Sequence, residues 1–415
     1  MKMKKFVLVP VLFSFLAIYA QEKKNSIAPN ENLIAQNIAE IPKELAAQVK
    51  KYSEARGASL VEIHPTKNEI IINTRFGSTA QLHRVSQPLG ARTQITFFDE
   101  PVNGASYEPL KGEYLVYTRD VGGNEFGQLY KLDLKTQQST LLTDGGRSQN
   151  GGINWRKDGK GFYYSSTKRN GGDRDIYYMD PNDPKTTKLV LQVKGGGWGI
   201  SDISNDGKKL LITEYISANE SHIWILETES GKLSEVTDRK STGIIQTGAS
   251  FSDKNDEIWF VTDKDNEFQR LATLNLSTKK VIYYTSKIPW NVENYILSED
   301  KKTIGFVTNE AGLNKMYLMK ASDKSYAVKN IPIGLIGGGA FTKDNQQLFF
   351  TQSTAQTASD VYKLNLATGA IQRWTESELG EMQQSDMALP KFIEWKSFDN
   401  LKISGFYYPA AAKFN

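Results

Sequence analysis

A segment with the same pattern recurs seven times along this chain of 415 residues. Each copy begins with two runs of β-forming residues joined by a short turn rich in Asp, Asn, Gly and Lys. Equivalent apolar positions are spaced by 44, 48, 48, 48, 46 and 44 residues, and are occupied by Ile63, Tyr107, Trp155, Ile203, Phe251, Leu297 and Phe341. Such regularity indicates an array of like units that bury their apolar faces against one another.

Each copy continues with a third and then a fourth short β-run. The second copy, for example, reads ASYEPLKGEYLVYTR, then QLYKLDL and then STLLTD. In other copies the first turn contains Asp158-Gly159 or Asp206-Gly207, pairs that are typical of tight hairpins. Four short strands in every repeat of this length predict an all-β fold, a seven-bladed β-propeller of four-stranded antiparallel blades. We place the propeller at residues 57–380.

The segment before the propeller, residues 21–56, is predicted to contain one short helix. In residues 41–56 the apolar side chains of Leu45, Val49 and Tyr52 recur at helical spacing, and a proline lies near the start.

The segment after the propeller, residues 381–415, is predicted to be a linker followed by a β-hairpin. Apolar residues alternate along both arms, and Asp399-Asn400 supplies the turn. A hairpin with many large apolar side chains is expected to bury them against another surface. The residues expected in that interface are Phe392, Ile393, Trp395, Leu401, Ile403 and Tyr407.

The first twenty residues have the composition of a secretory signal peptide. A basic start with three lysines leads into the apolar run 6–20, and Ala20 precedes a suitable cleavage point at Gln21. The alternative is an uncleaved anchor, but a transmembrane helix needs ~20 apolar residues. We assign residues 1–20 to a signal peptide and expect an exported protein, periplasmic or extracellular.

The net charge and the absence of cysteine limit the kinds of partner and of covalent modification that we expect. The net charge of +4 includes the three lysines of the signal peptide; without them, 48 basic residues face 47 acidic ones, a net charge of +1. A near-neutral chain predicts no nucleic-acid partner and, after signal cleavage, no membrane partner. With no cysteine, neither a disulfide framework nor a lipid-modified cysteine is possible.

Three features in order resemble the prolyl oligopeptidase family of serine peptidases: the helix, the first blade and the terminal hairpin. The first blade carries TRFGSTAQLHRV at residues 74–85 and ARTQITFFDEPV at residues 91–102, which look like the acylaminoacyl- and dipeptidyl-peptidase-like members. The hairpin runs from Phe392 to Pro409 and includes Ser397, Asp399, Ile403, Gly405 and Tyr407. The resemblance extends over nearly the whole mature chain.

In that family, the hairpin opens an α/β-hydrolase domain that carries Ser, Asp and His, and the propeller restricts access to short peptides. This sequence contains no G-x-S-x-G nucleophile elbow and no Glu-Glu pair of the kind that holds a substrate amine in dipeptidyl-cleaving members. We therefore expect the chain alone to be inactive, truncated or encoded without its hydrolase. Its expected partners are the missing α/β-hydrolase domain or short peptides.

Other candidate sites are weaker. His64, His83 and His222 are spread over separate repeats, so no general base beside a nucleophile is indicated. The run TDKDNEF lacks the glycine and the final glutamate of an EF-hand loop, so we predict neither a metal nor another cofactor. Arg75 and Arg119 follow the second strand of the first two repeats, where each could clamp a carboxylate; the alternative is an ordinary loop charge.

Three functions remain open. The first is the substrate-gating propeller of an exported prolyl oligopeptidase-like peptidase. The second is a stand-alone envelope propeller that binds protein or peptide as a scaffold. The third is a propeller enzyme with catalysis at its axis, which would need inner carboxylates and a metal.

Overall fold

The computed structural model describes residues 25–27, 30 and 32–410. The chain divides into two compact units, Met1–Glu54 and Ala55–Asn415. The predicted signal peptide lies outside the described residues.

The first unit contains a short strand pair and one helix. Strand β1 (Ser26–Ile27) pairs antiparallel with β2 (Ile41–Pro42), and α1 (Lys43–Ser53) follows directly. The predicted helix is confirmed. Its three apolar side chains, Leu45, Val49 and Tyr52, are exposed. Among the described residues, no helix has both the length and the apolar character needed to cross a membrane.

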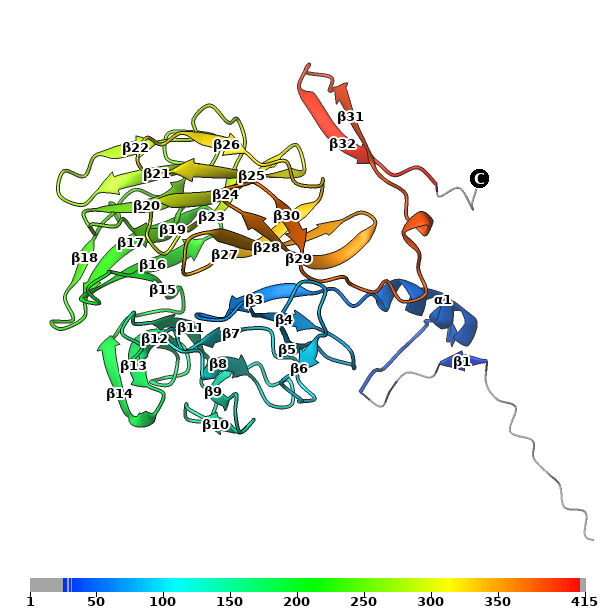
Figure 1. Cartoon of the computed structure of the whole chain (residues 1–415), viewed down its shortest axis with the longest axis horizontal. Coiled ribbons are helices and arrows are strands. Elements are labelled where there is room, and N and C mark those ends of the chain that lie inside the picture. Colours follow the sequence, from blue (N-terminus) through cyan, green and yellow to red (C-terminus); the bar gives the residue numbers. More distant parts are fainter. Residues whose placement is uncertain (1–24, 28–29, 31, 411–415) are drawn as a thin grey trace, which may run out of the picture. The chain divides into compact units, whose positions relative to one another are not determined.

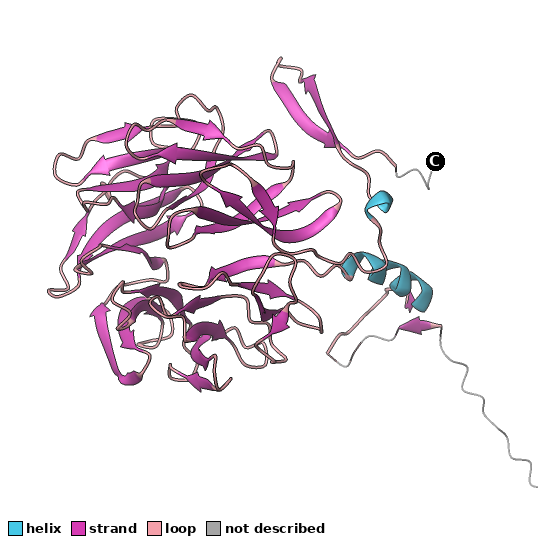
Figure 2. Cartoon of the chain, viewed as in Figure 1, coloured by secondary structure: helices cyan, strands magenta, loops and turns pink. Residues whose placement is uncertain are grey.

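The second unit contains seven four-stranded antiparallel sheets, and the four strands of each sheet are consecutive in the chain (Figures 1 and 2). The predicted seven-bladed propeller is confirmed. The strands of blades one to three are β3 (Ser59–Ile63), β4 (Ile70–Thr74), β5 (Gln81–Val85), β6 (Thr93–Gln94), β7 (Ala105–Tyr107), β8 (Tyr114–Arg119), β9 (Gln128–Asp133), β10 (Ser139–Leu141), β11 (Asn150–Trp155), β12 (Phe162–Ser166), β13 (Asp175–Asp180) and β14 (Asp183–Leu191).

The remaining blades follow the same plan. The strands of blades four to seven are β15 (Trp198–Ile203), β16 (Lys209–Ser217), β17 (Glu220–Glu227), β18 (Leu233–Glu235), β19 (Gln246–Phe251), β20 (Glu257–Thr262), β21 (Arg270–Asn275), β22 (Val281–Tyr283), β23 (Val292–Leu297), β24 (Thr303–Glu310), β25 (Leu313–Lys320), β26 (Tyr326–Val328), β27 (Leu335–Phe341), β28 (Gln347–Thr354), β29 (Thr357–Asn365) and β30 (Ile371–Arg373).

The core lies between the blades. The first strands of most neighbouring blades contact one another, so the first strand of each blade is the inner one. Seven apolar clusters fill the seven junctions between consecutive blades. The cluster that contains Ile70, Phe349 and Trp374 joins blade seven to blade one, so the ring is closed by packing.

In blades three to seven, the turn between the first and second strands has left-handed backbone at one position. Gly159 and Gly207 adopt it with φ of 68° and 71°, as the Asp-Gly pairs predict. Asparagine takes the same position in blades five and seven. In blade six the residue is Lys301, with φ of 57°, although a lysine gains nothing from this conformation.

The chain ends in the predicted hairpin, which follows a short 3-10 helix, η1 (Gln384–Asp386). Strand β31 (Lys391–Lys396) pairs with β32 (Lys402–Tyr407), and the turn lies at Asp399-Asn400. The Phe406 ring lies close to Gly312 in the loop between β24 and β25.

Candidate functional site

Polar side chains gather at the end of the inner strands that leads into the first turns. Most inner strands carry a register irregularity just before this end, for example between Leu60 and Glu62 and between Ile200 and Asp202. A bulge re-aims the side chain that follows it. The bulges of blades one and four therefore set the direction of two carboxylates, Glu62 and Asp202.

Asp202 links three blades. Its carboxylate accepts the N–H groups of Ile203 and Phe251, both at 2.8 Å, and Phe251 belongs to the next blade. It also forms an ion pair with Lys301 of blade six, with Nζ 3.4 Å from Oδ2. Because blades four and six are not neighbours, the Lys301 side chain reaches across the space that the inner strands surround.

A second contact of this kind comes from blade seven. The Lys343 Nζ donates a hydrogen bond to the carbonyl of Pro109 in blade two. Lys157 of blade three donates to the Asn205 amide oxygen of blade four at 2.6 Å. Lysines from three first turns thus bind groups on other blades.

Glu62 is the carboxylate with the most perturbed acidity in this region. It accepts the N–H of Ile63 at 3.1 Å and the Ser106 hydroxyl at 3.2 Å. Burial raises the pKa of Glu62 to about 7, and the negative charge of Glu299 acts in the same direction. The two hydrogen bonds and Lys343 oppose the rise without cancelling it.

This cluster was not predicted from the sequence, although the repeats carry a signal for it. The residue before the apolar anchor is polar in the first five copies, and these residues are Glu62, Ser106, Asn154, Asp202 and Ser250. A polar residue at that position in consecutive inner strands predicts a polar lining at one end of the axis. Which lysine pairs with which carboxylate does not follow from the alignment.

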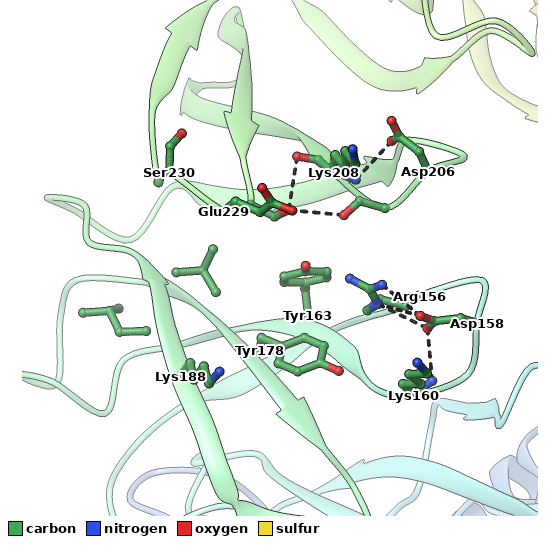
Figure 3. A pocket seen from close by; sticks show the side chains of 15 residues that line it. Arg156, Asp158, Lys160, Tyr163, Tyr178, Lys188, Asp206, Lys208, Glu229 and Ser230 are labelled. Carbon is green, nitrogen blue, oxygen red and sulfur yellow. Dashed lines mark hydrogen bonds and ion pairs between the residues drawn. The ribbon is translucent and has the colours of Figure 1, made fainter.

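A groove of about 880 Å³ opens between blades three and four. Figure 3 shows Arg156 and two tyrosines on the blade-three side facing Asp206 and Lys208 on the blade-four side. Arg156 binds Asp158 at 2.8 Å and lowers the pKa of that carboxyl. The lining offers charged side chains, hydroxyls and main-chain groups that could bind a polar ligand.

Arg119 already has partners inside the protein. Its Nη1 donates to Glu100 at 2.8 Å, and its guanidinium lies over the Phe98 and Tyr130 rings at 4.2 and 5.0 Å. The pKa of Glu100 is lowered, mainly by the Gly122 N–H and also by Arg119. Contact of Arg119 with a substrate therefore stays a prediction. It would require the Arg119 guanidinium to bind the substrate and Glu100 at the same time.

Arg75 lies directly after β4 and is half-buried. It belongs to a different blade from Arg119, and its contact with a substrate also stays a prediction.

The three histidines are buried in separate places. The Nδ1 of His64 accepts the N–H groups of Thr66 and Lys67, and burial lowers the pKa of His64. His83 contacts the carbonyl of Gln81, and His222 contacts Glu220 at 3.1 Å. Across the described ranges, no three His, Asp or Glu side chains are placed to hold a metal ion.

The terminal hairpin exposes apolar side chains on both faces. Strand register places Ile393, Trp395, Ile403 and Tyr407 on one face, and the alternation extends this face to Leu401. Phe392 lies on the opposite face, paired with Phe406. The six residues expected in one interface therefore divide between the two faces.

Comparison with known proteins gives the family. Residues 102–377, which include all strands from β7 to β30, match the family described as the prolyl oligopeptidase N-terminal beta-propeller domain. No curated protein sequence matches the chain.

Solved structures agree with the fold. A structure from a study of two prolyl endopeptidases superposes with a TM-score of 0.70 at 14% identity, covering 88% of this chain and 56% of that one. Prolyl oligopeptidase B from Galerina marginata, bound to a 35mer hydrolysis and macrocyclization substrate, gives 0.69 at 15% identity with the same coverage. The chain thus spans little more than half the length of these structures. Fold, repeat and family match together show that this chain belongs to the family of prolyl oligopeptidase N-terminal β-propeller domains.

Proposed function

We propose that this chain is the substrate-gating propeller of an exported prolyl oligopeptidase-like serine peptidase, and that it works with an α/β-hydrolase domain. The family match over residues 102–377 is the observation that carries the proposal. Gating means that the ring admits short peptides to the hydrolase and holds back longer or folded chains.

Contacts between non-neighbouring blades support the gating role. Asp202–Lys301 and Lys343–Pro109 both reach across the inner space at the first-turn end. Side chains that cross this space narrow it, so a folded chain is not expected to pass that end.

The hairpin supports the docking of a hydrolase domain. Trp395 and Tyr407 share one face, and each is about half exposed at 49% and 54%. Large apolar side chains left in water together mark an interaction surface. Because each side chain is already about half buried, covering the rest contributes roughly half of the ~1.5–3 kcal/mol that full burial of a large apolar side chain gives.

A fusion protein tests the gating role. The hydrolase domain of a prolyl oligopeptidase is joined after Pro409, and kcat/KM is measured on a proline-containing octapeptide and on a long unfolded chain with the same cleavage site. We expect the fusion to prefer the octapeptide. The double variant Asp202→Ala, Lys301→Ala should narrow this preference without changing turnover of a small proline arylamide. Equal rates on both peptides for the unmodified fusion would contradict gating, and loss of arylamide turnover would reveal a misfolded variant.

The groove of Figure 3 favours a second candidate, a scaffold that binds peptide or protein without a hydrolase. Fluorescence anisotropy of labelled peptides with the chain alone separates the two. Tight binding that is lost on Arg156→Ala would favour the scaffold, and no binding would favour the gating propeller.

A further inference from the structure

The junction between blade seven and blade one differs from a strand-exchanged closure. The four strands of every blade are consecutive in sequence, so no strand from one end of the propeller completes a blade at the other. Apart from the apolar cluster, the ion pair of Arg56 with Glu378, the hydrogen bond from the Leu60 N–H to the Thr351 hydroxyl and several main-chain hydrogen bonds cross the junction. The Ala58 N–H donates to the Ser359 carbonyl at 2.7 Å, and the Leu89 N–H donates to the Trp374 carbonyl at 2.8 Å.

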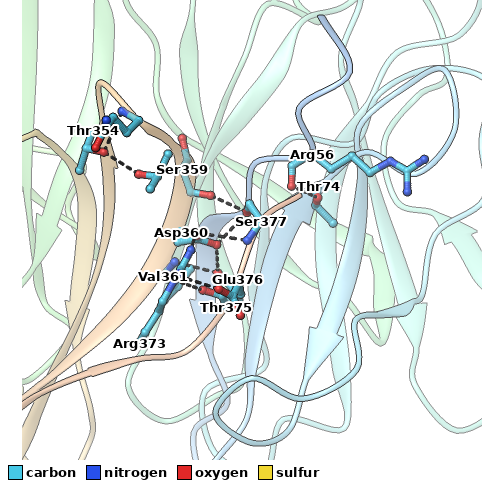
Figure 4. A network of polar contacts seen from close by, with 12 residues as sticks. Arg56, Thr74, Thr354, Ser359, Asp360, Val361, Arg373, Thr375, Glu376 and Ser377 are labelled. Carbon is cyan, nitrogen blue, oxygen red and sulfur yellow. Dashed lines mark hydrogen bonds and ion pairs between the residues drawn. The ribbon is translucent and has the colours of Figure 1, made fainter. Parts of the chain in front are cut away.

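On the blade-seven side of this junction, Asp360 is a buried and fully bonded carboxylate. Its side chain is 1% exposed. It accepts hydrogen bonds from Arg373 at 2.7 Å, from the Thr375 hydroxyl at 2.7 Å and from the Ser377 N–H at 3.2 Å (Figure 4). These partners belong to blade seven or to the chain that leaves it, so they satisfy the charge within one blade.

From the blade-one side, Arg92 reaches into the same network. Its guanidinium donates to the Arg56 carbonyl at 3.0 Å and to the Ser377 hydroxyl at 3.1 Å. Its Nη2 also lies 3.6 Å from Asp360 Oδ1, and the side chain is 10% exposed. One buried cation therefore binds groups on both sides of the junction.

Blade three provides a comparison. Asp175 occupies the position of Asp360, as the first residue of the buried part of the third strand, and it is likewise buried. Its arginine partner, Arg169, binds it at 2.6 Å but comes from the same blade. In blade seven the carboxylate has a same-blade arginine, Arg373, and in addition Arg92 from the other side of the ring closure.

We infer that Arg92 is a latch that holds the first and last blades together, and that the ring opens locally at this junction when the latch is removed. Without Arg92, Asp360 keeps Arg373, Thr375 and Ser377, so blade seven loses none of its own bonds. The ion pair and the hydrogen bond that cross to blade seven are lost. The expected effect is local opening of one junction.

Thiol labelling tests the inference, because the chain contains no cysteine and an introduced one is the sole thiol. Val361→Cys reports on the junction of blades seven and one, and Val116→Cys reports on the junction of blades two and three; both valines are 0% exposed. The labelling rate by an aqueous thiol reagent is measured for each reporter with Arg92 intact and with Arg92→Met. Arg169→Met, which removes the same-blade arginine from Asp175, is the matched control.

We expect Arg92→Met to raise labelling at position 361 by ~10-fold or more, the scale of one lost charge-assisted hydrogen bond, and to change labelling at position 116 by less than ~2-fold. Arg169→Met should not raise the labelling rate at position 361 more than the labelling rate at position 116. Equal acceleration at both reporters on Arg92→Met would mean that Arg92 only contributes to global stability. No acceleration at either would mean that the apolar cluster and the other bonds across the junction close the ring without Arg92. Either result overturns the latch.

Discussion

Replacing Glu62 by glutamine tests the electrostatics at the end of the ring where the inner strands lead into the turns between first and second strands. Burial raises the pKa of this carboxyl from 4.5 to about 7 in the folded protein. Between these values the folded state holds a proton that the unfolded state releases, so the contribution of Glu62 to stability falls as pH rises from about 4.5 towards 7. Above pH 7 the folded protein carries a partly buried charge, and glutamine removes it while keeping the shape of the side chain.

The size of the effect follows from the two pKa values. Their difference corresponds to ~3 kcal/mol at high pH and to almost nothing at low pH. For a domain of this length ~1 kcal/mol moves the melting temperature by roughly 2 °C, so the variant should melt ~5 °C above the wild type at about pH 8.5. At about pH 4 the two should melt together, because both side chains are neutral.

Thermal unfolding followed by circular dichroism at the two pH values measures this difference. Glu108→Gln serves as a control, since Glu108 accepts three main-chain N–H groups at 2.7, 2.8 and 3.0 Å. An amide has one oxygen to replace two, so this variant should be less stable than the wild type at pH 8.5. A Glu62→Gln variant that melts with the wild type at both pH values, or is stabilised equally at both, would refute the reasoning.

Two further predictions concern activity and the hairpin. The isolated chain should not hydrolyse peptide arylamides or acyl esters, because its sequence has no nucleophile elbow; turnover that a serine-directed fluorophosphonate blocks would contradict this. Deleting residues 386–415 should lower the melting temperature by less than ~5 °C and reduce light scattering, because the hairpin exposes its apolar side chains. A larger fall would show that the hairpin belongs to the propeller core.

The blades were predictable from the sequence because the same pattern of residues recurs seven times. Each copy contains an apolar anchor residue, a tight turn and an apolar second strand. The seven anchors from Ile63 to Phe341 are enough to count the blades. The turn chemistry was also predictable, since the glycines at 159 and 207 take the left-handed backbone that the hairpins require.

The division of the hairpin into two faces could also have been read from the sequence. Phe392 and Ile393 are adjacent in one strand and so point to opposite faces. The same alternation puts Ile393 and Trp395 on one face, and their interface with a further domain stays a prediction.

The side-chain contacts between different blades could not be derived from the repeat pattern. Asp202 and Lys301 are 99 residues apart, and the residues around each of them do not indicate that the two side chains form an ion pair. Lys301 even occupies a left-handed backbone position that holds glycine or asparagine in blades three, four, five and seven, so local preference argues against a lysine there. Its ion pair with Asp202 forms once blades four to six have folded beside one another around the axis.

The same reasoning applies to Arg92. Seen within the first repeat, it is one more charge in the loop before a short strand, and surface loops are full of such charges. It becomes a buried partner of Asp360 once seven blades have brought the last repeat back beside the first. A repeat specifies each blade and its nearest neighbours, whereas the closing junction joins the two copies that lie farthest apart in the chain. Residues that act at this junction therefore depart from the repeat pattern, and such departures are where a latch of this kind can be sought in other propellers whose blades do not exchange strands.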